Sequence, residues 1–143
     1  MALANVLLVD DEVPFVEAMT KRLTKRNIKI TTAYSGHEAL DRLNKDHSIE
    51  IVILDVKMPG MDGIEALKEI KKRYPLAEVI MLTGHATVES AIEGMKLGAF
   101  DYLMKPCDMD QLISKVSEAV AKKRRHEDKI VEARMKEITG RRV

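Results

Sequence analysis

Five side chains whose chemistry suits a phosphoryl group each follow a short apolar run. They are Asp10, Asp11, Asp55, Thr83 and Lys105. Clustered carboxylates repel one another, and a hard cation such as Mg²⁺ relieves this repulsion while leaving room for waters and a phosphate. A lysine and a hydroxyl nearby would add a fixed positive charge and a hydrogen-bond donor. If the fold brings the five together, a carboxylate can attack phosphorus while cations neutralise the transferring oxygens.

The apolar runs before these side chains have the length and composition of buried β-strands. Runs of Val, Ile and Leu without polar alternation are typical of strands covered on both faces, as in a parallel sheet. We expect five such strands: Val6–Val9, Ile28–Ala33, Ile51–Leu54, Val79–Leu82 and Tyr102–Met104.

Helical patterns with recognisable ends separate these strands. Pro14 suits the first turn of the first helix, and Ser35 with Glu38 has the capping-box spacing for the second. Further cap candidates mark the remaining helices: Asp62 with Glu65, Thr87, Gly98, and Asp108 with Gln111.

This alternation predicts an α/β fold, a flavodoxin-like (βα)5 doubly wound parallel sheet with strand order 2-1-3-4-5 and an extended C-terminal helix. Such sheets bind ligands at the carboxyl ends of strands, near the point where the strand order reverses. The first and third strands are neighbours there, so Asp10, Asp11 and Asp55 should meet. Asp55 is the best nucleophile candidate, because it is central and stands alone at its strand end.

The composition limits the classes of protein that fit. The chain has 143 residues, 45% hydrophobic and 33% charged, as expected of one soluble globular domain. A single cysteine, Cys107, excludes an internal disulfide and favours a reducing, cytoplasmic setting. We expect no membrane span and no secretory signal. A net charge of +1 and only five aromatic residues argue against direct nucleic-acid binding.

Other functions fit parts of the pattern. A haloacid-dehalogenase-like phosphatase also forms an aspartyl phosphate with Mg²⁺, but it needs a second carboxylate two residues after the nucleophile. This chain has Lys57 at that position. A module that only binds proteins would not need the whole set of site residues. The five side chains together suit a carboxylate that accepts a phosphoryl group better than either alternative.

Four motifs resemble the receiver domain of bacterial two-component response regulators, over about residues 4–121. They are LLVDDE at 7–12, LDVKMPGMDG at 54–63, MLTG at 81–84 and GAFDYLMKP at 98–106. The last is most similar to receivers of sigma-54-dependent, nitrogen-regulation-type transcription activators. The resemblance implies a phosphorelay in which the partner is a histidine kinase. It also implies a phosphoacceptor signalling domain that takes part in its own phosphotransfer and autodephosphorylation, and not an enzyme.

The resemblance also implies how the phosphoryl group is held. Asp55 would accept it. Asp11, Asp55 and the backbone carbonyl of Lys57 would bind Mg²⁺, with Asp10 acting through a water. Lys105 would contact the phosphate.

Two more residues would carry the signal outward, according to the same resemblance. Thr83 would turn toward the phosphate and Tyr102 would follow, changing the face formed by the fourth helix, fifth strand and fifth helix. Pro106 would follow a cis peptide bond. From position alone, Lys57 and His85 are candidates for controlling water access to the phosphoryl group, and so its lifetime.

The end of the chain differs in charge from the rest. Residues 1–121 form the predicted receiver and 122–143 a basic helical extension or linker. Residues 121–143 carry nine Lys/Arg and four Asp/Glu, against fifteen and nineteen in residues 1–120. Val131, Met135 and Ile138 recur at spacings of four and three, so we expect the last helix to continue to about Thr139. A solvated linker fits best, with a partner helix or a nucleic-acid contact as alternatives.

The chain contains no ATP-binding or helix-turn-helix motif. We therefore expect either a stand-alone receiver that acts through protein–protein interaction, or a fragment whose transcriptional output domain lies elsewhere. The basic end at residues 140–143 favours the fragment. A homodimer through the face of the fourth helix, fifth strand and fifth helix, extended by the tail helix, is the expectation from the family.

Overall fold

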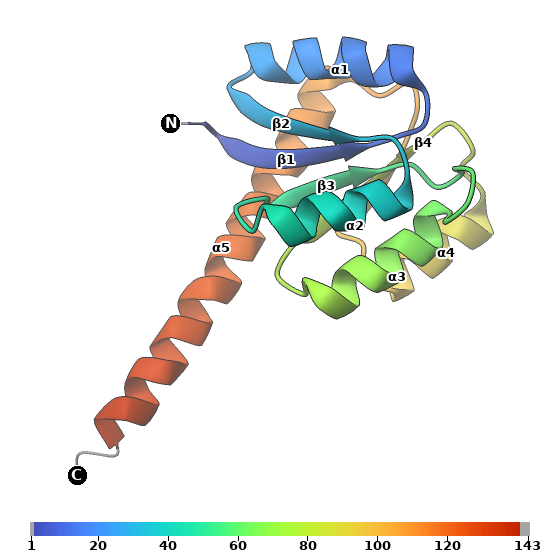
Figure 1. Cartoon of the computed structure of the whole chain (residues 1–143). Helices are drawn as coiled ribbons and strands as arrows, with labels where there is room; N and C mark the ends of the chain where they lie inside the picture. Colours follow the sequence, from blue (N-terminus) through green and yellow to red (C-terminus); the bar gives the residue numbers. More distant parts are fainter. Residues whose placement is uncertain (1, 141–143) are drawn as a thin grey trace.

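The computed structural model describes residues 2–140, and the expectation about the basic end at 141–143 falls outside this range. Its core is one parallel sheet in the order β2-β1-β3-β4-β5 (Figure 1). The strands are β1 (Ala4–Val9), β2 (Ile28–Ala33), β3 (Ile51–Leu54), β4 (Glu78–Thr83) and β5 (Asp101–Met104). The predicted fold class and strand order are confirmed.

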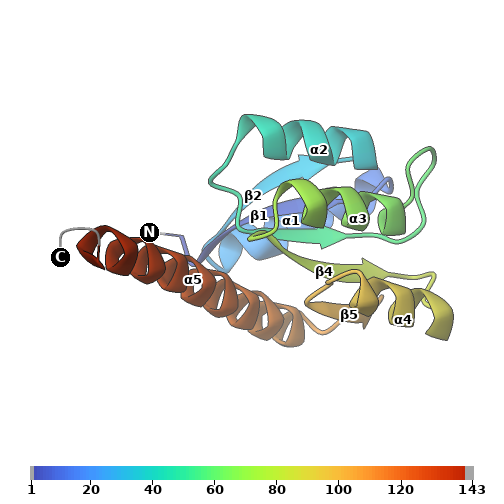
Figure 2. The ribbon, with the colours of Figure 1, turned by 90° about the horizontal axis from the view of Figure 1, so that it is seen from below.

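Helices cover both faces of the sheet, as the all-apolar strands require. They are α1 (Val13–Lys25), α2 (Gly36–Lys45), α3 (Gly63–Arg73), α4 (Val88–Lys96) and α5 (Met109–Gly140). One buried cluster joins the sheet to α1 and α5, and a second joins it to α2 and α3, beside which α4 lies (Figure 2). Alternate strand residues divide between these two clusters, so both faces of each central strand are buried.

Three strands begin earlier than the apolar pattern predicts, and one of them is β5, which starts at Asp101, one residue before Tyr102. Ala4 pairs with Ile28, so β1 starts two residues before Val6. Glu78 pairs with Ile51, so β4 starts on a charged residue that is almost completely buried. An apolar pattern alone cannot detect a strand that begins on a buried charge.

The helix ends agree with most of the predicted caps, with one correction. The Ser35 hydroxyl accepts a hydrogen bond from the Glu38 amide at 3.1 Å. The Glu38 carboxylate, however, accepts from the amide of Tyr34 at 3.4 Å, so the second half of the capping box serves the residue before the cap. Gly98 adopts a φ of 102°, which favours glycine, directly after the C-cap of α4.

The last helix, α5, is 32 residues long and has no break at residue 121. Its first part packs on the sheet and its second part projects away from the body (Figure 1). The predicted continuation to about Thr139 is confirmed. Within residues 2–140, no helix has the length and apolarity needed to cross a membrane.

Candidate functional site

The parallel register places Asp10 and Asp55 side by side. Val9 and Leu54 are paired across β1 and β3, and each is followed by one of the two aspartates. The Asp55 amide donates to the Val9 carbonyl at 3.0 Å, which continues the ladder past the end of the strands. Both side chains are therefore held by sheet backbone.

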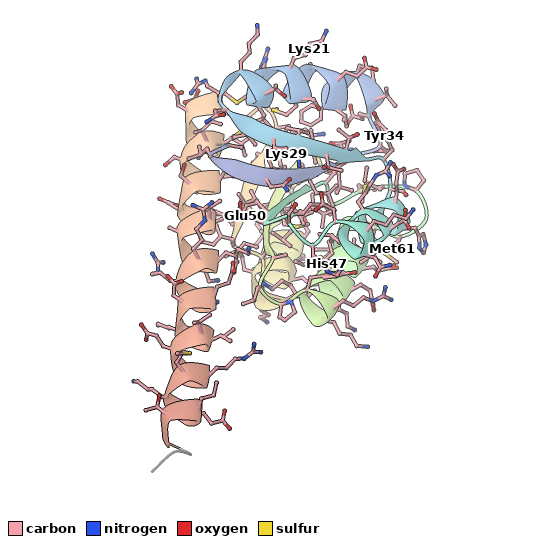
Figure 3. The ribbon with its side chains drawn as sticks, turned by 60° about the vertical axis from the view of Figure 1, so that its left-hand side comes forward. Lys21, Lys29, Tyr34, His47, Glu50 and Met61 are labelled. Atoms are coloured by element: carbon pink, nitrogen blue, oxygen red, sulfur yellow. The ribbon has the colours of Figure 1, made fainter. Side chains whose placement is uncertain are left out.

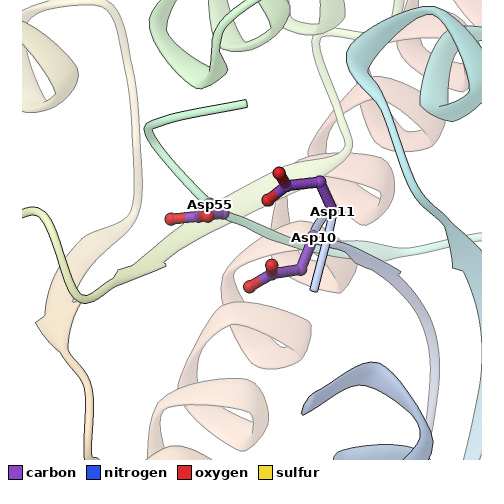
Figure 4. Close-up of side chains that lie close together, drawn as sticks. All are labelled: Asp10, Asp11 and Asp55. Atoms are coloured by element: carbon purple, nitrogen blue, oxygen red, sulfur yellow. The ribbon is translucent and has the colours of Figure 1, made fainter. Parts of the chain in front are cut away.

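Asp10, Asp11 and Asp55 form one cluster of carboxylates at this edge (Figure 4). One carboxylate oxygen from each lies within 4.8 Å of the other two. Asp10 is 1% exposed and Asp55 is 2% exposed, whereas Asp11 is exposed. Buried carboxylates at this separation need a compensating positive charge, and an oxygen-only donor set suits a hard divalent cation. The residues therefore fit Mg²⁺.

The ammonium of Lys105 provides a positive charge next to these carboxylates. Its Nζ lies 2.6 Å from Asp10 Oδ2, 3.4 Å from Glu12 Oε1 and 3.9 Å from the centre of the Phe15 ring. Its amide donates to the Thr83 carbonyl at 2.9 Å, and the Lys105–Pro106 peptide bond is cis. The carboxylates, the ring and the backbone thus hold the lysine over the cluster.

Burial and neighbouring charges shift the pKa values of Asp10 and Lys105. Burial raises the pKa of Asp10, and the charge of Asp55 adds to this, although Lys105 opposes it. Burial lowers the pKa of Lys105, but its hydrogen bond to Asp10 and the surrounding carboxylates raise it by more. The pKa of Asp10 is therefore raised mainly by burial, whereas that of Lys105 is raised by the carboxylates around it.

Thr83 and Tyr102 lie on neighbouring strands, and each makes its own hydrogen bond. Thr83 is fully buried, and its hydroxyl accepts from the amide of His85 at 3.0 Å. Tyr102 is half-buried, with its hydroxyl 2.7 Å from Ser90 Oγ on α4. Ser90 also completes a capping box with Thr87 at the start of this helix. The first turn of α4 is therefore tied to the ring of Tyr102.

Gly63 allows the loop after Asp55 to close. The Gly63 amide donates to the Val56 carbonyl at 2.6 Å, and a Cβ at this position would overlap the carbonyl oxygen of Asp55. Gly63 is the first residue of α3, directly after the predicted cap Asp62. Its contact explains why no larger residue fits.

Lys57 and His85 line one cleft of about 430 Å³, which also includes Val56, the residue after Asp55. Its lining is formed by Val56, Lys57, Asp62, His85, Ala86, Thr87 and Ser90. Both side chains are exposed and come from different loops, after β3 and after β4. A larger groove of about 750 Å³ between α2 and α3 contains none of the predicted site residues.

Some contacts of the site were not predicted from the sequence. Glu12 and Phe15 hold Lys105 from 93 and 90 residues away, and a pairing over that distance leaves no local pattern. Ser90 has a local signal, because it stands three residues after the predicted cap Thr87, at the capping-box position. Its bond to Tyr102 needs the packing of α4 on β5 and is not visible in the sequence.

Comparison with known proteins identifies the class that the fold and site define. The profile of the response regulator receiver domain matches residues 6–117. The chain therefore belongs to the response regulator receiver family, as the four motifs predict.

Individual relatives agree with this assignment. The DNA-binding transcriptional regulator NtrC of Klebsiella pneumoniae is 38% identical over 114 residues, which is 80% of this chain and 24% of that protein. A receiver domain protein of Clostridium thermocellum is 38% identical with a TM-score of 0.81, covering 85% of this chain and 97% of that one. NtrX of Brucella abortus is 32% identical with a TM-score of 0.80, covering 90% and 29%.

The expected similarity to nitrogen-regulation-type receivers is confirmed by the match to NtrC. The chain spans about a quarter of the length of the curated relatives it matches.

Proposed function

We propose that this chain accepts a phosphoryl group on Asp55 from the phosphohistidine of a histidine kinase, as the receiver of a two-component response regulator. The observation that carries the proposal is the position of Asp55. It is buried in a carboxylate cluster at the carboxyl edge of the sheet, next to the position of Lys105. A carboxylate held rigidly beside cations is a competent phosphoryl acceptor.

The proposed metal site uses the same carboxylates. Asp11, Asp55 and the backbone carbonyl of Lys57 would hold Mg²⁺, and Asp10 would act through a water. When bound, the ion supplies positive charge to the oxygens of the phosphoryl group. The short contact between Asp10 and Lys105 supports the indirect role of Asp10, because that carboxylate already has a cationic partner.

In the transfer itself, a carboxylate oxygen of Asp55 forms a bond to phosphorus while the bond from phosphorus to the donor nitrogen breaks. The imidazole of the donor leaves and takes a proton from solvent. Lys105 orients and neutralises the phosphoryl oxygens, which is where most of the stabilisation of the transition state arises. For the Lys105 ammonium to reach them, it has to weaken its contacts with Asp10 or Glu12.

The switch that follows is proposed to run through Thr83 and Tyr102. A phosphoryl group adds strong acceptors and about 1.5–2 negative charges, which attract the hydroxyl of Thr83. Turning Thr83 requires loss of its bond to the His85 amide. The space that it leaves admits the ring of Tyr102, which then releases Ser90 and alters the start of α4.

The lifetime of the phosphoryl group is proposed to depend on Lys57 and His85. Their position on the cleft beside Asp55 supports this, because water that hydrolyses the phosphate must approach from solvent. The Lys57 stem and charge would cover the phosphate and slow hydrolysis.

The output is proposed to be transcriptional and exerted through the α4–β5–α5 face in the cytoplasm. This face exposes large apolar side chains that a partner could cover: Val88, Ile92, Met95 and Met104. A homodimer through this face, extended by the tail residues Val131, Met135 and Ile138, fits these exposed surfaces. NtrC is a DNA-binding transcriptional regulator much longer than this chain, which supports a transcriptional output domain outside it. We propose that this output is of the sigma-54-dependent kind, as the motif at 98–106 suggests. A stand-alone receiver that acts only through protein–protein contacts is the alternative.

The direct test is incubation with a small acyl phosphate and Mg²⁺, followed by the intact mass. The parent should gain about 80 Da, the mass of one phosphoryl group, whereas Asp55→Ala should gain nothing. Removal of Mg²⁺ by a chelator should prevent the gain in the parent. An equal gain in Asp55→Ala would refute the assignment of the acceptor.

A further inference from the structure

Two glutamates lie at the opposite edge of the sheet from the phosphoacceptor site. Glu50 directly precedes β3 and Glu78 begins β4, and the Glu78 amide donates to the Glu50 carbonyl at 3.1 Å. Glu78 is 1% exposed. Glu50 is mostly buried and accepts from the amide of Asn5 at 3.3 Å. Neither carboxylate takes part in the proposed phosphotransfer, so the burial of these charges needs another explanation.

The partners of both carboxylates come from three successive basic residues of α5. Lys122 Nζ lies 3.3 Å from Glu78, while Lys123 Nζ and Arg124 Nε lie 3.8 Å and 3.4 Å from Glu50. Figure 3 shows Glu50 between the sheet and the long helix. These three residues stand where α5 leaves the body, directly after the last buried residues of the helix.

The burial of Glu78 makes this contact important for the fold. Its other cationic partner is Lys71 on α3, at 4.0 Å. Lys71 also donates to the carbonyls of Pro75 and Ala77, and burial lowers its pKa. If Lys122 moved away, Glu78 would keep one distant partner in a nearly dry position, which is costly for a carboxylate. The buried Glu78 therefore favours the conformation in which Lys122, at the start of the projecting part of α5, stays packed against the receiver.

The same ion pairs reduce the number of basic tail residues that are available to bind another molecule. Lys122 and Arg124 pair with the body. Lys123 is shared between Glu50 at 3.8 Å and Glu127 of the tail helix at 2.6 Å, so all three are less available to a polyanion. Residues 125–140 contain four Lys/Arg and four Asp/Glu, so the helix beyond the contact is balanced in charge. Within the described residues, the positive charge of the tail is thus directed at the receiver itself.

We propose that Glu50 and Glu78 form an acidic clamp that fixes Lys122, Lys123 and Arg124, making the root of the tail helix part of the receiver. The boundary of the rigid unit then lies beyond residue 124 and not at 121. The helix from 125 to 140 extends about 24 Å from this clamp, at 1.5 Å per residue. Because the helix is continuous, a shift of α5 on the sheet would move residues 125–140 together with it as one rigid element.

Hydrogen–deuterium exchange of the full, unphosphorylated chain tests the clamp. Exchange of backbone amides reports the local opening of a segment, and residues 119–127 form the segment of interest. In the double variant Glu50→Gln/Glu78→Gln, exchange there should rise by about tenfold, because the pairs are partly screened from solvent. Peptides from β1 and β3 should exchange as in the parent. Glu132→Gln is the matched control, since it makes the same change at an exposed tail position and should alter nothing.

A charge swap separates direct pairing from general loss of stability. Glu50→Arg should open residues 119–127, and Glu50→Arg/Arg124→Glu should restore most of the protection. If Glu78→Gln also opens the core, Lys122→Met becomes the decisive variant, because it alters only the tail side. Unchanged exchange at 119–127 in variants with an intact core, or a swap that restores nothing, would overturn the proposal. Neither result depends on phosphorylation at Asp55.

Discussion

Among the individual residues, the site is defined by an excess of negative charge. Asp10 and Glu12 contact the ammonium of Lys105, and Asp11 and Asp55 lie in the same carboxylate cluster as Asp10. The carboxylates raise the pKa of Lys105, whereas the pKa of Asp10 is raised first by burial and further by the charge of Asp55. A bound divalent cation would remove the repulsion, so metal binding and folding stability should be coupled.

The first prediction concerns Asp11, the exposed carboxylate of the cluster. Saturating Mg²⁺ should stabilise the parent by about 1–3 kcal/mol, because the ion binds the folded state alone. Asp11→Asn should lose most of this gain. Without Mg²⁺, the variant should be at least as stable as the parent, since one repelling charge is gone. Thermal unfolding with and without Mg²⁺ measures both effects.

Glu17→Gln is the matched control for this experiment. It also removes one exposed carboxylate, but on α1 and outside the cluster. It should retain the full response to Mg²⁺. An Asp11→Asn variant that responds as strongly as the parent would contradict the proposed metal site.

The second prediction concerns the lifetime of the phosphoryl group. Lys57→Asn shortens the side chain that would cover the phosphate and removes its charge, so hydrolysis should accelerate by about threefold to tenfold. The half-life of the phosphorylated chain after removal of the donor is the quantity to measure. Lys72→Asn, an exposed lysine on α3, should leave it unchanged. An unchanged half-life in Lys57→Asn would remove this role.

At the scale of elements, the loop between β3 and α3 depends on a close backbone approach. Gly63 begins α3 directly against the Asp55 carbonyl. Gly84, after β4, has space around it, with only the Lys105 side chain at 4.0 Å. Two glycines near the same site therefore have different structural requirements.

The third prediction uses this difference. Gly63→Ala should destabilise the chain by about 2–4 kcal/mol, because its Cβ meets backbone that cannot move without displacing Asp55. Gly84→Ala should stay within about 1 kcal/mol of the parent. Urea unfolding monitored by circular dichroism gives both values. Equal stabilities would show that the loop relaxes freely.

The fourth prediction concerns the connection between β4 and α4. Thr83→Ala removes the hydroxyl that would follow the phosphate, so Asp55 should still be phosphorylated but the effect on self-association should weaken by about tenfold. Sedimentation of both chains, with and without acyl phosphate, measures the effect. Equal gains in self-association on phosphorylation would reject the role of Thr83 as the switch.

The elements themselves were largely predictable from the sequence. Apolar runs and cap residues indicate the five strands and five helices, because buried strands and helix ends leave local patterns. The exact first residues of the strands were harder to predict, as the start of β4 at the buried Glu78 shows. The convergence of Asp10, Asp11 and Asp55 follows from topology alone, since neighbouring parallel strands end at one edge.

At the scale of the whole molecule, the long-range pairs escaped prediction. Glu12 and Phe15 around Lys105, Ser90 beside Tyr102, and Glu50 and Glu78 against the tail all join distant segments. Charged side chains are ordinarily exposed, so nothing in the local sequence distinguishes Glu12, Glu50 and Glu78. The cap position of Ser90 leaves a local pattern, but its contact with Tyr102 does not. The near-neutral total charge conceals an acidic body whose two edges have different functions. One edge would hold a cation and a phosphate, and the other holds the tail of the chain.

Chemical identification of the phosphorylated residue tests the central claim most directly. Borohydride reduces an acyl phosphate to an alcohol, which converts a phosphorylated aspartate to homoserine. After treatment with acyl phosphate and Mg²⁺, reduction and peptide mapping should find homoserine at position 55 and only there. Homoserine at another aspartate, or a phosphorylated chain that yields none, would contradict the account.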